Sequence, residues 1–286
     1  MKIGIIGAGV VGKSIARTYL EFVDEIRVYD KYVRELRTHE HPRDFLDCDI
    51  LFVCVPEDEL EKLFQHWCTT DDPKNYISGF LNHNWVIKST VPVGTTKRLR
   101  EKYGLSNLVH SPEFLTARCA ETDARVPAVN VIGSPTGLTL MRNDVKTFYP
   151  GPGNSAHRKL WELYDRRFPG TCCINMTSDE SEFLKIALNS TFAVKVSWFN
   201  ELRQLSDKLG LDWETIRSGM LADGRLTAHH TRVPGPDGKR GFGNKCLPKD
   251  LGQFIACYYE HNATLTPIIA QAAAIRNSHD RKEGGK

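Results

Sequence analysis

The sequence contains no apolar run that approaches the roughly 20 residues needed to span a bilayer. It also lacks an excess of one charge, because the net charge of its 286 residues is +3, too small to indicate a nucleic-acid-binding protein. Residues 1–12 superficially resemble a signal peptide, but glycines break the apolar segment and no convincing cleavage site follows. We therefore expect a cytoplasmic protein, with neither membrane nor nucleic acid as a partner, whose length allows two domains.

Metal-binding cysteine patterns are also absent, although the chain has eight cysteines. They are Cys48, Cys54, Cys68, Cys119, Cys172, Cys173, Cys246 and Cys257. No two have the CxxC spacing, and the adjacent Cys172 and Cys173 would point to opposite faces of a strand, so no zinc site is expected. Without a secretory signal, we expect reduced thiols rather than disulfides.

A glycine-rich turn near the N-terminus has the context of a dinucleotide-binding fingerprint. Residues 2–6 form an apolar run, then come Gly7, Gly9 and Gly12, and helical periodicity continues from there. A second strand-like segment ends at Asp30, 18 residues beyond Gly12. Strand, glycine turn, helix, strand and acid in this order predict dinucleotide binding.

The positions of this turn have different roles. Gly7 permits the tight turn, Gly9 lets the backbone approach the pyrophosphate, and Gly12 allows the helix to pack closely on the strand. Val10 and Val11 begin the helix, whose N-terminus faces the phosphates. A glycine turn that serves only to reverse the chain is the structural alternative.

Asp30 determines which dinucleotide we expect. Its carboxylate would accept hydrogen bonds from the adenosine ribose hydroxyls and repel a 2′-phosphate, which favours NAD. Lys13 and Lys31 keep NADP open as an alternative. FAD could use the same fingerprint, but nothing else in the chain indicates a flavin.

Further strand-like segments alternate with helical ones in the first half. They are residues 48–56, 84–96, 107–115, 128–133 and 171–176. This alternation predicts an α/β fold, a Rossmann-type doubly wound parallel sheet of about six or more strands, over residues 1–177. Because ligands lie beyond the carboxyl ends of such strands, Val55, Pro56, Thr90 and Glu113 are expected to line the cofactor site.

The second half, residues 178–286, is predicted to be helical. Residues 177–180 have the form of a capping box, and apolar periodicity then predicts one long helix over 179–209, ended by Gly210. Shorter helices are expected over residues 212–221, from Pro248 to 261, and over 266–279, with a basic loop over 225–245. Lys185 and Asn189 share a face of the long helix, either as a solvated pair or as a catalytic pair.

Residues 238–250, GKRGFGNKCLPKD, place Cys246 in a glycine-rich basic loop that continues into Lys249 and Asp250. From this context alone, Cys246 is either a buried structural thiol or a nucleophile. The basic side chains around it favour the thiolate form.

Five segments together resemble the nucleotide-sugar dehydrogenases, the family of UDP-glucose and GDP-mannose dehydrogenases. They are the glycine fingerprint with Asp30, KSTVPVGTT, SPEFL, EFLKIALNS and GFGNKCLPKD. They occur in the family's order over nearly the whole chain, and the longer string VPGPDGKRGFG is similar to the glucose-type members.

The resemblance implies a four-electron oxidation of UDP-glucose to UDP-glucuronate that reduces two NAD. By this resemblance Cys246 is the nucleophile, and the other seven cysteines are assigned to packing. Lys185 and Asn189 would hold the developing oxyanion, and Asp250 and Glu113 would position water and relay protons. Thr90 would assist from the nicotinamide side, and Lys249 is a further cofactor contact.

Substrate binding is also implied by the resemblance. The expected substrate contacts are Glu113, Phe114, Leu115, Lys185, Asn189, Arg225, Gly243 and Cys246. Family members generally carry a further domain that clasps the substrate nucleotide, and we expect residues 1–286 to lack it. We therefore expect the basic loop 232–240 and Arg225 to bind the diphosphate across a homodimer or larger assembly built on helix 179–209.

Three departures from the family pattern concern the expected site. Asn244 stands at a usual glycine position, residues 116–118 replace an acid and a glycine, and Val55-Pro56 replaces a Thr-Pro corner. Two alternatives remain: a two-electron β-hydroxyacid dehydrogenase, which shares the Lys-x-x-x-Asn pair but needs no cysteine, and a non-catalytic NAD-binding regulatory module.

Overall fold

The structure is a computed structural model that describes residues 1–69, 77–116, 118–142, 145–150, 154–243, 245–261 and 266–283. Asn244 and Ala117, two of the departures noted above, lie outside these residues. The chain forms two compact units, Met1–Lys185 and Ile186–Lys286. The expected domain boundary near residue 177 stays a prediction. Within the described ranges, no helix is long and apolar enough to cross a membrane.

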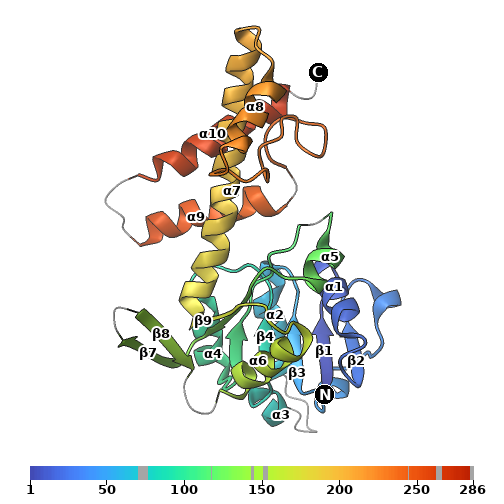
Figure 1. Cartoon of the computed structure of the whole chain (residues 1–286). Helices are drawn as coiled ribbons and strands as arrows, with labels where there is room; N and C mark the ends of the chain where they lie inside the picture. The colour runs from blue at the N-terminus through green and yellow to red at the C-terminus, as the bar shows by residue number, and fades with distance from the viewer. Residues whose placement is uncertain are drawn as a thin grey trace. The chain divides into compact units, whose positions relative to one another are not determined.

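The first unit is built on a sheet with the strand order β2-β1-β3-β4-β5-β6-β9 over the described residues (Figure 1). The strands are β1 (Lys2–Ile6), β2 (Glu25–Tyr29), β3 (Ile50–Val53), β4 (Trp85–Ile87), β5 (Leu108–His110), β6 (Asn130–Ser134) and β9 (Cys173–Thr177). The strands from β2 to β5 are parallel, and so are β6 and β9, but β6 pairs antiparallel with β5 at His110 and Gly133. The predicted Rossmann-type sheet is confirmed, with this one antiparallel step as a difference.

Helices cover both faces of the sheet because side chains alternate along its buried strands. Apolar residues of α1 (Val10–Tyr19) and α6 (Ser155–Arg167) pack on one face, around Ile5, Phe52 and Val86. Residues of α2 (Glu57–Thr69), α3 (Ile77–Leu81) and α4 (Thr95–Tyr103) pack on the other. The short α5 (Ala120–Arg125) and a β7–β8 hairpin (Gly137–Arg142, Val145–Pro150) complete the unit, and the hairpin was not predicted.

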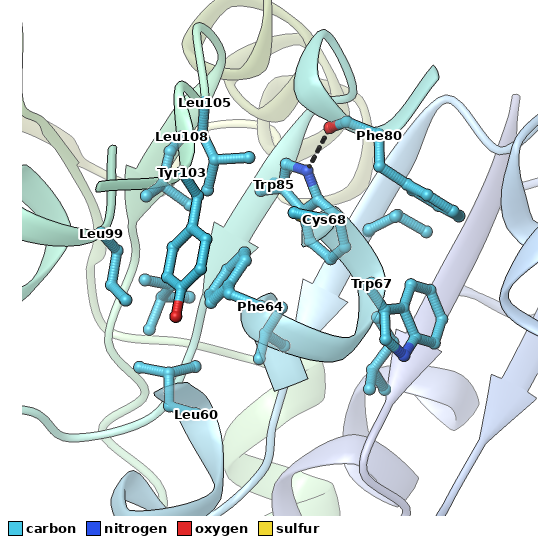
Figure 2. Close-up of a cluster of buried hydrophobic side chains, with 14 of the residues drawn as sticks. Leu60, Phe64, Trp67, Cys68, Phe80, Trp85, Leu99, Tyr103, Leu105 and Leu108 are labelled. Carbon is cyan, nitrogen blue, oxygen red and sulfur yellow. Dashed lines mark hydrogen bonds between the residues drawn. The ribbon is translucent and has the colours of Figure 1, made fainter. Parts of the chain in front are cut away.

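Figure 2 shows a cluster of buried hydrophobic side chains that includes Trp85, the first residue of β4. Trp85 is fully buried, contacts Phe64 with ring centroids 5.1 Å apart, and donates its indole N–H to the carbonyl oxygen of Phe80 at 2.8 Å. Trp67 packs against both Phe80 and Trp85. Aromatic residues bury large areas, so this cluster anchors the start of β4 in the core of the first unit.

The long helix α7 (Ser178–Lys208) confirms the prediction of one helix over 179–209. Its capping box is present: Thr177 and Glu180 exchange side-chain and backbone hydrogen bonds of 2.8 and 3.2 Å. Gly210 ends it with φ of +65°, a conformation that favours glycine. Three shorter helices follow: α8 (Trp213–Ala222), α9 (Cys246–Glu260) and α10 (Ile268–Glu283).

Helix α9 begins at Cys246, earlier than the start near Pro248 that the sequence predicts. Proline is tolerated in the first turn of a helix, because the amides there have no partner within the helix. The earlier start changes the expected site, since it moves Cys246 from a loop to the first residue of a helix.

Candidate functional site

The glycine turn after β1 has the geometry that its fingerprint requires. Gly7 has φ of +98°, and a Cβ atom there would lie 2.8 Å from backbone atoms of Cys54. A Cβ atom on Gly12 would lie 1.9 Å from the carbonyl oxygen of Gly7, which no side chain tolerates. These two glycines therefore let α1 start directly against the end of the strand.

Gly9 differs from its neighbours because a Cβ atom there would meet no atom within 4 Å. It is the N-cap of α1, and no side chain caps the helix amides. Val10 is 56% exposed, whereas Val11 packs on the core of the unit. Open backbone and uncapped helix amides fit a pyrophosphate, so these residues could hold the dinucleotide.

Asp30, at the end of β2, is turned toward the same glycine turn. Its Oδ2 accepts a hydrogen bond of 2.6 Å from the amide of Ala8, and its Oδ1 accepts from Tyr32 and Val33 at 2.8 and 2.9 Å. Burial acts to raise the pKa of Asp30, but these three bonds outweigh it and hold the pKa below its ordinary value. The ionised carboxylate keeps lone pairs for ribose hydroxyls.

Val55, Thr90 and Glu113 follow β3, β4 and β5, three parallel neighbours, so they lie at one edge of the sheet. Val55 is half-buried, and its carbonyl oxygen accepts a 2.5 Å hydrogen bond from Ser89. Pro56 is exposed beside it. The predicted residues of the first unit therefore lie at the sheet edge where the glycine turn also lies.

Glu113 and Lys185 form a salt bridge of 3.2 Å although they are 72 positions apart in sequence. Lys185 is only 4% exposed, and its Nζ lies 5.5 Å from the ring centroid of Phe114. The other carboxylate oxygen of Glu113 accepts a 2.6 Å hydrogen bond from the amide of Leu115. A buried lysine is costly unless it is paired, and this pair places a cation beside a carboxylate that can exchange protons.

In the second unit, Asn189 donates a hydrogen bond from its side-chain amide to Asp250. Asp250 is 1% exposed, and its other oxygen lies 2.8 Å from Nζ of Lys249. Asn189 is one turn of α7 beyond Lys185, on the same face of that helix. The structure thus brings the predicted catalytic residues into two contacts, Glu113–Lys185 and Asn189–Asp250–Lys249.

Cys246 is the first residue of α9 and is exposed. The amides of a helix N-terminus stabilise negative charge, and this favours the thiolate. Burial instead raises the pKa of Cys48, Cys54 and Cys68 to about 12, so these remain thiols at neutral pH.

All eight cysteines are free in the structure. The assignment of the other seven to packing is wrong for Cys119 and Cys172, because both are exposed. Their side chains lie on short surface segments rather than in a core.

Arg225 is exposed and pairs with Asp223, two positions before it. Arg240 in the basic loop pairs with Asp207 of α7 at 2.7 Å. The expected roles of Arg225 and of the loop in binding a diphosphate therefore stay predictions.

Two buried polar residues, Glu182 on the first turns of α7 and His110 of β5, were not among the residues that the sequence predicted for the site. Glu182 is fully buried and accepts hydrogen bonds from the amides of Gly94 and Thr96, at 2.6 and 2.8 Å, and from the Thr96 hydroxyl at 2.5 Å. It thereby joins α7 to the N-terminus of α4. His110 is also fully buried, and it lies 2.6 Å from the hydroxyl of Ser181. The contact of Glu182 with α4 could have been suspected from one sequence signal, the acid inside the motif EFLKIALNS.

Glu182 is expected to make stability depend on pH. Burial raises its pKa from 4.5 to about 7, although the three hydrogen bonds act to lower it. A carboxyl whose pKa is higher in the folded state stabilises the fold fully below about pH 4.5, and this contribution is lost as pH rises to about 7. At about 1.4 kcal/mol per pH unit, the free energy of unfolding should fall by about 2–3 kcal/mol between pH 5 and pH 8, relative to a Glu182→Gln variant.

Urea unfolding of both proteins across this pH range measures the difference. Burial lowers the pKa of His110 to about 3, so His110 destabilises the fold as pH falls below its ordinary value of 6.5, but this contribution is the same in both proteins and cancels from the difference. The exposed Glu201 on α7 offers a control, Glu201→Gln, that should leave the pH dependence unchanged. Parallel curves for the wild type and Glu182→Gln would contradict the prediction.

Residues 179–278 match the model of the UDP-glucose/GDP-mannose dehydrogenase family, central domain. A UDP-glucose 6-dehydrogenase from Campylobacter jejuni is 29% identical over 236 residues, which cover 81% of this chain and 54% of that protein. The chain thus spans about half the length of this curated relative.

Among solved structures, a UDP-glucose dehydrogenase from Pyrobaculum islandicum has a TM-score of 0.76 at 22% identity, over 97% of this chain and 68% of that one. A 3-hydroxyisobutyrate dehydrogenase from Mycobacterium tuberculosis has a TM-score of 0.71 at 15% identity, over 99% and 94%. The fold is therefore common to nucleotide-sugar and hydroxyacid dehydrogenases, and fold alone does not separate the two interpretations. The sequence comparisons favour the nucleotide-sugar interpretation, because residues 179–278 match the central domain of the UDP-glucose/GDP-mannose dehydrogenase family and the curated relative is a UDP-glucose 6-dehydrogenase.

Proposed function

We propose that this chain catalyses the NAD-dependent, four-electron oxidation of UDP-glucose to UDP-glucuronate. The observation that carries the proposal is the position of Cys246, exposed at the first residue of α9 and four residues before the buried Asp250. A hydroxyacid dehydrogenase has no use for a nucleophilic thiol there. The names of the curated relatives support UDP-glucose as the substrate.

The residues at the glycine turn fit NAD. Gly9 leaves the space that the pyrophosphate needs, and the ionised Asp30 suits the ribose hydroxyls of NAD but would repel the 2′-phosphate of NADP. When bound, NAD accepts a hydride from the substrate carbon in each of two oxidation steps. Thr90 and Val55, at the edge of the sheet, are proposed to position the nicotinamide end, with Lys249 as a further contact.

In the proposed reaction, the substrate alcohol first loses a hydride and a proton and becomes an aldehyde, with Glu113 relaying the proton. The thiolate of Cys246 then adds to the aldehyde carbon, forming a C–S bond and moving the π electrons to the oxygen. Lys185 and Asn189 stabilise this oxyanion by charge and hydrogen bonding. Loss of a second hydride yields a thioester.

Hydrolysis of the thioester completes the reaction. Water adds to the thioester carbon, the C–S bond breaks, and Cys246 leaves as the thiolate. Asp250 is proposed to orient this water, because its buried carboxylate is held by Asn189 and Lys249. Phe114, Leu115 and Gly243 are proposed to contact the sugar.

The test is the number of NADH formed for each UDP-glucose consumed, by absorbance and chromatography of the product. Two NADH and UDP-glucuronate are expected. One NADH per substrate would contradict the thiol mechanism, and no turnover would leave the non-catalytic module as the better interpretation. The same assay with NADP should give a much lower kcat/KM, and comparable values would contradict the role of Asp30.

We further propose that the chain works as a homodimer or larger assembly built on α7. Exposed apolar residues support this: Trp198 and Leu205 on α7 are 54% and 57% exposed, and Leu209, directly after the helix, is 62% exposed. Phe192 is partly buried against His230, so it contributes less to this surface than the sequence suggested. Light scattering at assay concentration tests the assembly, and a fully active monomer would contradict it.

A further inference from the structure

The backbone just before Cys246 is held by the last turns of α10. Arg281 donates hydrogen bonds from Nε to the carbonyl oxygen of Phe242 at 2.9 Å and from Nη2 to that of Gly241 at 3.3 Å. Its Nη1 lies 2.6 Å from a carboxylate oxygen of Asp237, in the same basic loop. A single guanidinium therefore joins three points of this loop to α10.

The fit between Arg281 and the loop is tight. A Cβ atom on Gly243 would lie 2.4 Å from Nη2 and 2.7 Å from Cζ of Arg281, so only glycine lets the guanidinium lie against the backbone. Gly243 is three residues before Cys246, and the contact therefore acts on the segment that leads directly into α9.

Two asparagines hold the same segment from other sides. Asn277 of α10 accepts a 2.6 Å hydrogen bond from the amide of Phe242, and Asn200 of α7 accepts one of 3.1 Å from the amide of Gly241. The Phe242 side chain is 4% exposed and packs in the core of the unit. Because the backbone amides and carbonyls of Gly241 and Phe242 are hydrogen-bonded and the Phe242 side chain is buried, the segment 241–243 has little freedom to move.

We propose that Arg281 is a positioning residue for Cys246, acting through the segment 241–243 and touching neither substrate nor cofactor. By fixing this segment, it keeps the first turn of α9 formed and the thiol at the helix N-terminus, where the amides stabilise the thiolate. The catalytic consequence rests on the proposed function, whereas the effect on the thiol does not.

The test is the pH dependence of alkylation of Cys246 by iodoacetamide, followed by mass spectrometry of the peptide that contains it. This readout requires no substrate and separates Cys246 from the exposed Cys119 and Cys172. In Arg281→Ala, the midpoint of the alkylation curve should rise by about half a pH unit, the size of a lost helix-terminus effect. An unchanged midpoint would overturn the proposal.

Two further variants keep the test decisive. Arg281→Lys retains the charge for Asp237 but lacks the planar guanidinium that reaches this carboxylate and both carbonyl oxygens together, so an intermediate midpoint is expected. This variant decides the outcome if Arg281→Ala does not fold, and a wild-type midpoint would then overturn the proposal. Lys282, exposed at the next position of α10, gives the matched control Lys282→Ala, which should behave as wild type.

Kinetics separate this inference from the proposed function. If the wild type oxidises UDP-glucose, Arg281→Ala should lower kcat about tenfold while leaving KM for NAD unchanged, because the glycine turn and Asp30, which are proposed to hold the dinucleotide, belong to the other unit. A shifted alkylation midpoint in a protein without this activity would support the positioning role and reject the function. A fall in kcat with an unchanged midpoint would overturn the positioning role.

Discussion

Replacing Cys246 by serine is expected to lower the rate of UDP-glucuronate formation by at least about 10³-fold. A serine hydroxyl is almost entirely protonated at neutral pH, and the helix N-terminus cannot make it an adequate nucleophile without a base. The oxidation should then stop at the aldehyde, because the covalent adduct that loses the second hydride cannot form. Acid formation is measured by chromatography, and NADH by absorbance.

The other exposed cysteines provide the controls for this experiment. Cys119→Ser and Cys172→Ser remove thiols that are also exposed but lie in the first unit, and both should retain wild-type rates. Because Cys246 is exposed, its replacement leaves no cavity in the core, so the free energy of unfolding should hardly change. Acid formation by Cys246→Ser within tenfold of the wild-type rate would show that the covalent mechanism is wrong.

Replacing Lys185 by methionine is expected to lower kcat by about 10²–10³-fold, the usual effect of removing one group that stabilises an oxyanion. Methionine fills a similar volume but supplies no charge and no hydrogen bond. The loss should appear mainly in kcat, because the oxyanion develops only after the substrate is bound. Steady-state kinetics with saturating NAD measure it.

Part of this effect belongs to Glu113, since Lys185→Met leaves its carboxylate with no salt bridge in a partly buried position. The single variant Glu113→Gln and the double variant separate the two contributions by a thermodynamic cycle. Lys208→Met, at the exposed end of α7, is the matched control and should retain activity. An increase in KM with unchanged kcat would contradict the oxyanion role.

The sequence by itself determined those features that depend on neighbouring residues. The strand β1, the glycine turn, the acid at Asp30 and the capping box of α7 were all predicted in place. Each follows from local chemistry: glycine adopts positive φ without steric cost, and Thr177 and Glu180 can satisfy each other's amides within one turn. The resemblance of ordered motifs also predicted the family that the comparisons support.

The tertiary structure alone decided which distant residues meet. Nothing local to Lys185 indicates that Glu113 is its partner, nor that Glu182 lies against the N-terminus of α4. Nor does the sequence near Arg281 indicate that its guanidinium lies against Gly243, which is 38 positions earlier in the chain. Such contacts arise from the packing of whole helices, and a buried charge finds its partner only once the water around it has been excluded.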